Sequence, residues 1–448
     1  MVKVNIISRS KLEWTKDRDG EVPRAHRNFD PKFNPLVKQT EYTRALRAAK
    51  LDQMFAKPFV AAMAGHHDTV ISIATDPTNL SVLASGGHDG EVVVWDTLSH
   101  KPRRTFMAHR NAVEGCVFTP DGVGILTAAK DRLIKLWDTD TSDGQGNLDV
   151  QVDPLATYNG ESQFTGIDHH WSKNWFATAG GNVEIWDLNR TRPVQSFNWG
   201  DDLVYDCAFN KVETDLVCCT MSDRGVAIYD TRTKKAHSKI IMDVSCNRVR
   251  WNPVDPNVFV AGSDDWNCYL FDIRVPGRPR NVYQGPVHPI TSVDFSPTGQ
   301  FIVAGATDCT VRLWDVNAVS KSNSTEMFHT KRMAKVTAVK FSLDNNYIFS
   351  GSEDAIVRVW KSDRSRPVRL LRGAEHHNFN YMRQLKDQYK GYEEIRRITN
   401  QRNTPKAIRK MQFKKRKIQQ REMVKEMARK KSDKLKPLAS KKVIQQLK

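Results

Sequence analysis

The sequence lacks any long apolar run. No window approaches the ~18–20 uninterrupted apolar residues of a membrane helix, and the stretch from Met1 to Lys11 is too short and too interrupted for a signal peptide. Neither secretion nor membrane spanning is therefore expected. Apolar residues still make up 39% of the 448 residues, so the chain can bury a large core and is not wholly disordered.

The sequence also lacks the spacing of a metal site. Its seven cysteines form no CxxC pair, and most lie in apolar strand-like runs, which is typical of small buried side chains in a reducing compartment. Adjacent histidines do not change this view, because neighbouring residues on a strand point to opposite faces. These pairs are His66-His67, His169-His170 and His376-His377. No metal and no cofactor are predicted.

Catalytic motifs are missing as well. The chain contains no GxxxxGK[ST] phosphate loop, no GxSxG elbow and no HExxH pair. The sequence therefore favours a non-enzymatic interaction scaffold, with no catalytic residues and no small-molecule substrate.

Charge is distributed unevenly along the chain. Residues 373–448 carry 23 Lys and Arg against 7 Asp and Glu, and residues 1–57 carry 13 against 7. Because the whole chain has a net charge of +18, the segment between them has a net charge of −4. A polyanion is thus expected to bind the two basic arms rather than the middle of the chain.

A Trp-Asp motif or a close relative recurs at the end of short apolar runs. Its aromatic residues are Trp95, Trp137, Trp186, Tyr229, Phe271, Trp314 and Trp360, at spacings of 42 to 49 residues. This is the period of a four-stranded propeller blade. The sequence therefore predicts an all-β, seven-bladed WD-repeat β-propeller over residues 58–372, resembling WD-repeat proteins. The domain division is a basic N-terminal arm and helix over 1–57, the propeller, and a basic helical extension over 373–448.

Two repeats have the hydrogen-bonded set that holds such blades together, in which a buried Asp and a buried indole both need partners. The first set is His66, Ser85, Asp89 and Trp95, and the second is His109, Thr127, Asp131 and Trp137. The later repeats depart from this pattern, and the third has the least certain register, with Gly180 at the Asp position. Two segments compete to close the ring as its last outer strand, residues 59–63 and residues 367–371.

The arms contain predicted helices. Residues 41–57 form an amphipathic pattern with Tyr42, Ala45, Leu46 and Ala49 on one face, which we expect to dock on the propeller. Residues 1–40 are typical of an extended segment. A second helix is expected around Met382 and Leu385. Thr404 and Pro405 mark the start of a long helix to about residue 431.

The long helix predicted from Pro405 has a sparse apolar stripe, so we expect it to become ordered only on a partner. A phosphate backbone is the partner that best matches its charge. An import signal or a solvated tail remains an alternative for any one basic run. The RNA-binding candidates are Arg396, Arg397, Arg409, Lys410, Lys414, Lys415, Arg416, Lys417, Arg429, Lys430 and Lys431. Interleaved aromatics are missing, so sequence-specific readout of bases is not predicted.

The arms also resemble a known family. The segments RNFDP at 27–31, EY at 41–42, RAL at 44–46, AKL at 49–51 and FAKPF at 55–59 are similar to the N-terminal signature of the suppressor-of-fibrillarin WD-repeat family. The segments FHTKRM at 328–333, EIRRI at 394–398 and PK at 405–406 are similar to the same family, whereas residues 401–404 depart from it. The resemblance implies a nucleolar assembly factor of the small-subunit processome in 18S rRNA maturation. Its implied partners are pre-ribosomal RNA, the box C/D small nucleolar ribonucleoprotein and processome proteins.

Two other classes of function stay open. One four-residue motif consists of an aromatic residue, Asp, any residue and Arg. It resembles the motif of propellers that serve cullin-RING ubiquitin ligases as substrate receptors. It occurs twice, and the adaptor contacts would be Asp230, Arg232, Asp272 and Arg274, unless these are ordinary strand-end residues. A signalling or chromatin scaffold is the third interpretation.

Overall fold

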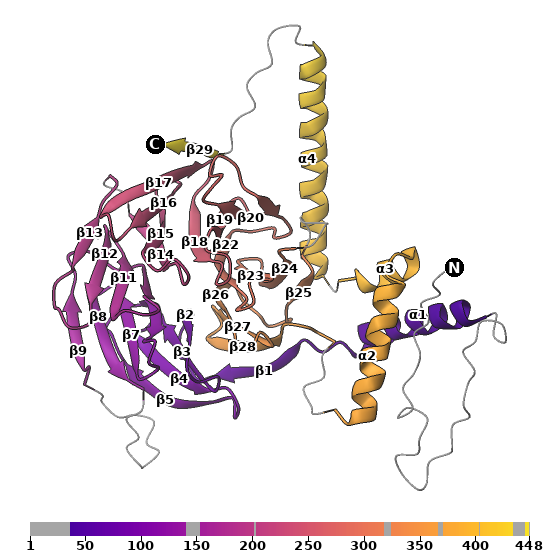
Figure 1. Ribbon diagram of the computed structural model, residues 1–448, viewed down its shortest axis with the longest axis horizontal. Coiled ribbons are helices and arrows are strands. Elements are labelled where there is room, and N and C mark those ends of the chain that lie inside the picture. The colour runs from indigo at the N-terminus through magenta and orange to yellow at the C-terminus, as the bar shows by residue number, and fades with distance from the viewer. Residues whose placement is uncertain are drawn as a thin grey trace, which may run out of the picture. The chain divides into compact units, whose positions relative to one another are not determined.

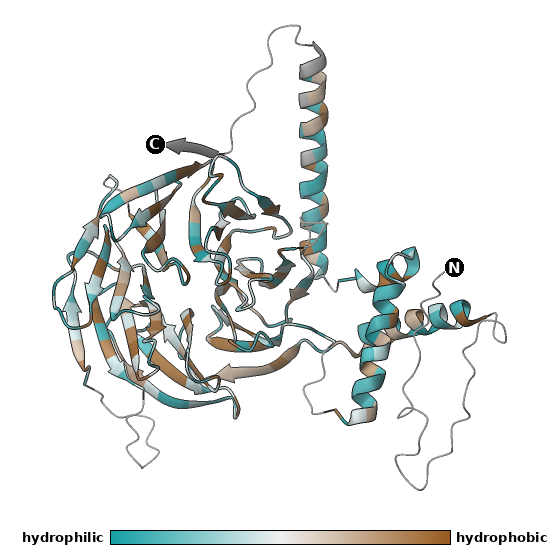
Figure 2. Cartoon of the chain, in the orientation of Figure 1, coloured by the Kyte–Doolittle hydropathy of each residue, from teal (hydrophilic) through white to brown (hydrophobic). Residues whose placement is uncertain are grey.

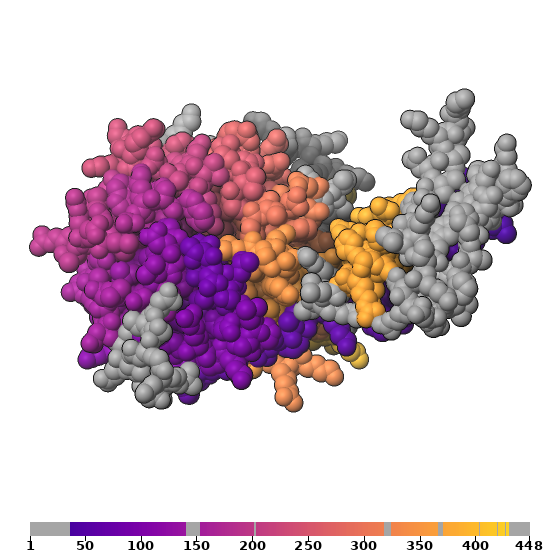
Figure 3. Space-filling view, turned by 60° about the horizontal axis from the view of Figure 1, so that its bottom comes forward, coloured from indigo at the N-terminus to yellow at the C-terminus, as the bar shows by residue number. Residues whose placement is uncertain are grey.

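The repeats fold into seven antiparallel sheets that follow one another in chain order around a common centre (Figure 1). In the space-filling view, the colours of the ring pass from indigo through magenta to orange in the order of the chain (Figure 3). The computed structural model describes residues 36–139, 153–200, 203–317, 324–365, 371–402, 404–432 and 444–447. The predicted seven-bladed β-propeller is therefore confirmed. Residues 1–35, which include the motif at 27–31 and most of the segment predicted to be extended, lie outside the described residues.

Each of the first four blades begins with its innermost strand. Blade 1 has β2 (Val70–Thr75), β3 (Val82–Gly87), β4 (Glu91–Asp96) and β5 (Lys101–Met107). Blade 2 has β6 (Val113–Phe118), β7 (Gly124–Ala129), β8 (Leu133–Asp138) and β9 (Ala156–Asn159). Blade 3 has β10 (Gly166–His169), β11 (Trp175–Ala179), β12 (Val183–Asp187) and β13 (Gln195–Phe197). Blade 4 has β14 (Val204–Phe209), β15 (Leu216–Met221), β16 (Gly225–Asp230) and β17 (Lys235–Met242), with β29 (Ile444–Leu447) paired to β17.

The remaining three blades complete the circle. Blade 5 has β18 (Cys246–Trp251), β19 (Val258–Ser263), β20 (Cys268–Asp272) and β21 (Asn281–Tyr283). Blade 6 has β22 (Ile290–Phe295), β23 (Phe301–Ala306), β24 (Thr310–Asp315) and β25 (Glu326–Phe328). Blade 7 has β26 (Val336–Phe341), β27 (Tyr347–Ser352) and β28 (Ile356–Lys361), and its outer strand is β1 (Phe59–Ala64).

Strand β1 settles how the ring closes. It pairs antiparallel with β28, so that Phe59 lies opposite Trp360 and Ala64 opposite Ile356. The first of the two competing segments thus supplies the closing strand and leaves no open edge at that point. The other segment, 367–371, lies outside the described residues except for its last residue.

Hydrophobic side chains fill the spaces between neighbouring blades. Between blades 1 and 2, for example, Val92 and Phe106 pack with Cys116 and Trp137 in one buried cluster. The apolar faces of adjacent sheets therefore bury one another, which a single blade could not do alone. Six of the seven cysteines are buried, as their apolar context indicated, and Cys309 is partly buried.

The expected hydrogen-bonded set is complete in blade 2. The indole Nε1 of Trp137 donates to Thr127 Oγ1 at 2.9 Å, Thr127 Oγ1 is 2.8 Å from His109 Nε2, and His109 Nδ1 is 2.9 Å from Asp131. In blade 1, Trp95 Nε1 and His66 Nε2 reach Ser85 Oγ at 2.7 and 2.6 Å. Asp89 instead accepts the backbone N–H of Glu91.

Blade 3 explains why its register was difficult to predict. The indole of Trp186 donates to Thr178, which is eight residues earlier, whereas the spacing from Ser85 or Thr127 to its Trp is ten. The turn between the second and third strands of blade 3 is therefore two residues shorter, which removes the position of the turn Asp. In blade 7 the ten-residue spacing returns, and Trp360 donates to Ser350 at 2.8 Å.

Three helices form a second compact unit, Met1–Pro58 with Asp363–Asn403. They are α1 (Val37–Phe55), α2 (Gly373–Gln388) and α3 (Glu393–Thr399). Ala45 and Ala49 of α1 pack with Tyr381 and Leu385 of α2 and with Ile395 of α3. The expectation that this face of α1 docks on the propeller was wrong, because α2 and α3 cover it.

Polar contacts in this unit also join α1 to the later helices. Tyr42 donates to Glu394 at 2.8 Å, Tyr389 donates to Glu41 at 2.9 Å, and Lys386 pairs with Asp52. Helix α4 (Lys406–Ser432), in contrast, groups with the ring and not with α2 and α3. The division of the chain at 57/58 and 372/373 stays a prediction. No helix among the described residues is long and apolar enough to cross a membrane.

Candidate functional site

The ring has two faces that carry different loops. We call the linker face the one with the loops between successive blades and the turns between second and third strands. The hairpin face carries the turns between first and second and between third and fourth strands. Because the strands of each blade are antiparallel, these two sets of loops lie at opposite ends of the strands.

The base of α4 is anchored on the linker face. Gln412 donates to the carbonyl of Gly285 in the β21–β22 loop at 2.9 Å. The ammonium of Lys415 lies 4.6 Å from the ring centre of Trp266 in the β19–β20 turn. Ile408 is buried. These three residues follow each other at intervals of four and three, so they share one side of the helix.

Trp266 occupies an unusual backbone position for this contact. Its φ is +74°, in the left-handed region. Trp266 follows the Asp in the turn between the second and third strands of its blade. The residue at the same place in other blades also has a positive φ, as Arg132, Arg224 and Cys309 show. Blade 1 has a glycine at this position, Gly90. A bulky residue there costs free energy, whereas its indole gives Lys415 a cation–π partner. Sequence reasoning did not find this anchor, since nothing in the WD-repeat pattern requires Trp in that turn.

Beyond its anchor α4 is strongly basic. The helix contains 12 Lys and Arg against 2 Glu over 27 residues, which is a length of about 40 Å. Figure 2 shows it as mostly hydrophilic. Exposed side chains include predicted RNA-binding residues, namely Arg409, Lys410, Lys414, Arg416, Lys417 and Arg429.

The remaining RNA-binding candidates are placed differently. Lys415 packs on Trp266, and burial lowers its pKa. Lys430 and Lys431 lie on α4, but their side chains are outside the described residues. Arg396 and Arg397 are exposed on α3, in the three-helix unit. The structure therefore does not collect all the candidates on one helix.

The predicted adaptor contacts lie on the hairpin face. Arg274 follows β20 and holds both carboxylate oxygens of Asp272, at 3.0 and 2.9 Å. Arg232 follows β16 and lies 4.0 Å from Asp230. Their side chains are 63% and 78% exposed. Both arginines belong to neighbouring blades and stand at the end of the ring opposite to the α4 anchor.

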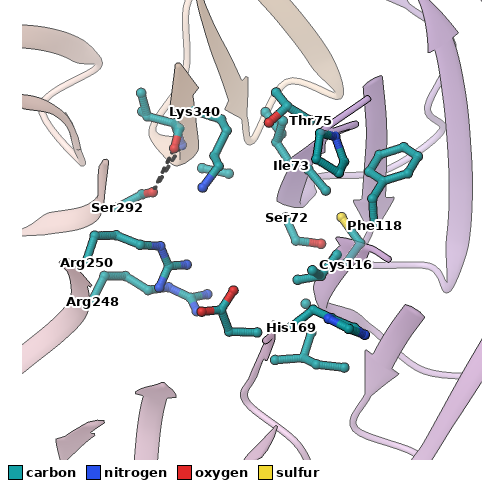
Figure 4. A pocket seen from close by; sticks show the side chains of 18 of the residues that line it. Ser72, Ile73, Thr75, Cys116, Phe118, His169, Arg248, Arg250, Ser292 and Lys340 are labelled. Carbon is teal, nitrogen blue, oxygen red and sulfur yellow. Dashed lines mark hydrogen bonds between the residues drawn. The ribbon is translucent and has the colours of Figure 1, made fainter. Parts of the chain in front are cut away.

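A cavity of about 160 Å³ lies among the innermost strands, and the residues following those strands line it on the hairpin side (Figure 4). Arg248 and Arg250 point into it side by side, and both bind Asp206, at 3.0 and 2.8 Å. Lys340 pairs with Asp294 at 3.2 Å. Burial acts to lower the pKa of Arg250, but the nearby carboxylates, Asp206 first, outweigh it and raise that pKa.

Lys211 is the cation in this cavity that has no carboxylate within ion-pair distance among the described residues. Its ammonium lies 5.3 Å from the ring of Trp171. Burial and then the charge of Lys340 lower its pKa. Two carboxylates, Glu114 and Asp168, line the cavity against four cations, and three of those cations pair with Asp206 or Asp294.

The fold and its charged helix define the class of the protein as a WD-repeat β-propeller with a basic helical extension. A WD-domain family model matches residues 57–96, 100–138, 277–315 and 323–361. A second model, the Sof1-like domain, matches residues 363–445.

Curated relatives extend this similarity over most of the chain. "Protein SOF1" of Saccharomyces cerevisiae is 34% identical over 92% of this chain and 87% of its own length. "DDB1- and CUL4-associated factor 13" is 37% identical in Homo sapiens, over 96% and 94%, and 35% identical in Xenopus tropicalis, over 91% and 90%. The chain therefore belongs to the Sof1 family of WD-repeat proteins, and the expected family membership is confirmed.

Proposed function

We propose that this protein is a non-enzymatic assembly factor of the small-subunit processome in the nucleolus. In this proposal α4 binds pre-ribosomal RNA during 18S rRNA maturation, and the ring binds proteins and the box C/D small nucleolar ribonucleoprotein. The observation that carries the proposal is the anchored basic helix. Its fixed base turns a run of exposed cations into a rod that can lie along a phosphate backbone.

Membership of the Sof1 family over most of the chain supports the same function. The contacts of Gln412 and Lys415 hold the start of α4 against the ring. Ordering these residues before RNA arrives reduces the entropy that binding has to overcome. Exposed lysines and arginines without interleaved aromatics fit contacts to phosphate rather than to bases.

Crosslinking to RNA in cells, followed by sequencing, tests this proposal. We expect the intact protein to enrich precursor small-subunit rRNA or its small nucleolar guide. Replacing Lys414, Arg416 and Lys417 by Gln should reduce that enrichment. The matched control replaces three exposed cations of the ring, Lys101, Lys331 and Arg332, by Gln. Equal loss in both variants, or no ribosomal RNA with the intact protein, would contradict the proposal.

A second function has an observation of its own. Relatives carry the name DDB1- and CUL4-associated factor 13, and Arg232 and Arg274 are exposed on one face of neighbouring blades. We propose that these two arginines would make the adaptor contact if the chain also serves as a substrate receptor.

Binding of purified DDB1 to the full chain measures this second function. Replacing Arg232 and Arg274 together by Ala should abolish binding. Arg190 is the matched control, because it also follows an aromatic-Asp pair, Trp186-Asp187 in blade 3, and its side chain is 68% exposed. Binding that survives the double substitution, or that Arg190→Ala removes equally, argues against this role.

A further inference from the structure

Blade 1 contains a buried histidine nitrogen that has no partner. The side chain of His66 is 0% exposed, and its Nε2 lies 2.6 Å from Ser85 Oγ. Its Nδ1 has no hydrogen-bond partner among the described residues. In blade 2 the same atom of His109 lies 2.9 Å from Asp131. A buried polar nitrogen without a partner costs free energy, so this difference between the two blades calls for a ligand.

Three potential metal ligands lie together beside His66, and one of them, Glu91, is close to this nitrogen. Glu91 Oε2 lies 3.7 Å from His66 Nδ1 and 3.2 Å from His67 Nδ1. One ligand atom each of His67, Asp89 and Glu91 lies within 4.8 Å of the other two. The unpartnered Nδ1 of His66 therefore adjoins this group of metal-ligating side chains at Glu91.

The strand argument against paired histidines does not apply here. His66 and His67 lie in the loop before β2, and His67 is in a bend. Both rings therefore turn toward Glu91 instead of pointing to opposite faces.

We propose that His66, His67, Asp89 and Glu91 bind one divalent transition-metal ion, with Zn²⁺ as the best match. Imidazole nitrogens and carboxylate oxygens are both zinc ligands, and four such atoms suit the tetrahedral geometry that zinc adopts. Bonds of about 2.0–2.1 Å place tetrahedral ligand atoms roughly 3.3 Å apart. The two distances from Glu91 to the histidine nitrogens, 3.7 and 3.2 Å, lie on either side of that value.

The surroundings suit a metal ligand. With a metal on Nδ1, the Nε2–H of His66 donates to Ser85, which fixes the ring as outer hydrogen bonds of metal-bound histidines do. Glu91 is 6% exposed, whereas the side chain of His67 is 84% exposed, so an ion can enter from the solvent side. Blade 2 lacks the set, because Arg110 and Leu133 stand where blade 1 has His67 and Glu91.

The site would join two loops of the linker face. His66 and His67 lie between the ring-closing strand β1 and β2, and Asp89 and Glu91 lie at the turn from β3 to β4. An ion held by both loops would keep the entry of the chain into blade 1 in place. The site therefore has a structural role that is separate from RNA or protein binding.

Titration of the full-length, chelator-treated protein tests the site. Isothermal titration calorimetry with Zn²⁺ should give one saturable site. Co²⁺ should give the visible absorption of a tetrahedral site without a thiolate charge-transfer band. Such a band would place the ion on cysteine and overturn the proposal.

Substitutions locate the ion. His67→Ala and Glu91→Gln should each weaken Zn²⁺ binding by at least about tenfold. His88→Ala is the matched control, because His88 is also exposed and lies 3.6 Å from Asp68 in the neighbouring part of the same loops. If His88→Ala weakens binding as much as His67→Ala does, or if the intact protein binds no Zn²⁺, the proposal is wrong.

A stability measurement separates loss of the site from loss of the fold. Without zinc, the melting temperatures of His67→Ala and the intact protein should agree. Zn²⁺ at the same concentration should raise the melting temperature of the intact protein and of His88→Ala, because the ion binds the folded state, and should raise that of His67→Ala clearly less. An equal rise in all three proteins would also refute the site.

Discussion

His170 makes the pH dependence of the ring a testable consequence of its hydrogen bonds. It follows β10 and is 1% exposed, and its Nδ1 accepts the backbone N–H groups of Ser172 and Lys173 at 3.1 and 2.9 Å. Protonation of Nδ1 would break both bonds. Burial first, and then the charges of Lys173 and His169, lower the pKa of His170 to about 4.

The sign of the effect follows from this shift. The unfolded chain binds a proton at His170 near pH 6.5, whereas the folded chain does so only near pH 4. The stabilisation is therefore complete above pH 6.5 and is lost as the pH falls toward 4. With these two pKa values the loss in the free energy of unfolding is about 2 kcal/mol at pH 5 and about 3 kcal/mol at pH 4.

His170→Asn is the informative change, because the ring already uses Asn at this position in two other blades. The side-chain oxygen of Asn210 accepts from Val212 and Glu213, and that of Asn252 accepts from Val254 and Asp255. Asn keeps the acceptor but cannot take up the proton.

Urea unfolding at pH 7 and at pH 5 provides the comparison between the intact protein and this variant. Removing the imidazole that packs against Phe209 should make the variant less stable at pH 7. On going to pH 5 the intact protein should lose about 2 kcal/mol more than the variant does. If both proteins lose the same amount, His170 does not titrate as its hydrogen bonds require and the reasoning fails.

Three other expectations concern the blades and the helix. Thr127→Val should lower the free energy of unfolding by about 2–4 kcal/mol, because it leaves the buried nitrogens of Trp137 and His109 unpaired. Thr178→Val should lower it by about half as much, because only Trp186 loses its partner. Equal losses in thermal unfolding would contradict this expectation. Trp266→Gly should increase the rate of hydrogen exchange in α4, because it removes the partner of Lys415. Cys309→Gly, at the matching turn position of blade 6, should remove the same backbone strain at a positive φ but leave exchange in α4 unchanged. Equal exchange rates in the two variants would refute the anchor. Replacing Lys414, Arg416 and Lys417 by Gln should reduce the slope of log affinity against log salt by about 0.7 for each side chain that binds a phosphate of single-stranded RNA, and an unchanged slope would show that these side chains do not touch phosphate.

Local patterns in the sequence predict the blades well and their exceptions poorly. Recurrent Trp-Asp motifs predict seven sheets because each buried indole needs an acceptor at a fixed distance along the hairpin, as Trp137 and Thr127 show. Blade 3 escapes this pattern because a turn that is two residues shorter moves the acceptor to Thr178. Its strand pairing is otherwise ordinary, so only the register of the motif is lost.

Contacts between distant segments were harder to predict. The apolar stripe of α1 indicates a buried face, but amphipathicity does not identify the partner. That face meets α2 and α3, which are more than 300 residues away along the chain. The anchor of α4 has the same origin, because the contact of Lys415 with Trp266 depends on which turn lies beneath the helix.

The two proposed functions use opposite ends of the ring, and this decides how they relate. The α4 anchor involves Trp266 and Gly285 at the linker face, while Arg232 and Arg274 stand beyond the other ends of the strands in blades 4 and 5. Strands of six residues at about 3.4 Å each separate the faces by roughly 20 Å, which is beyond the ~8 Å screening length at physiological salt. An adaptor on the hairpin face would therefore neither cover the α4 anchor nor neutralise the cations at the base of the helix. The two functions need not exclude each other in one molecule, so evidence for either one does not argue against the other.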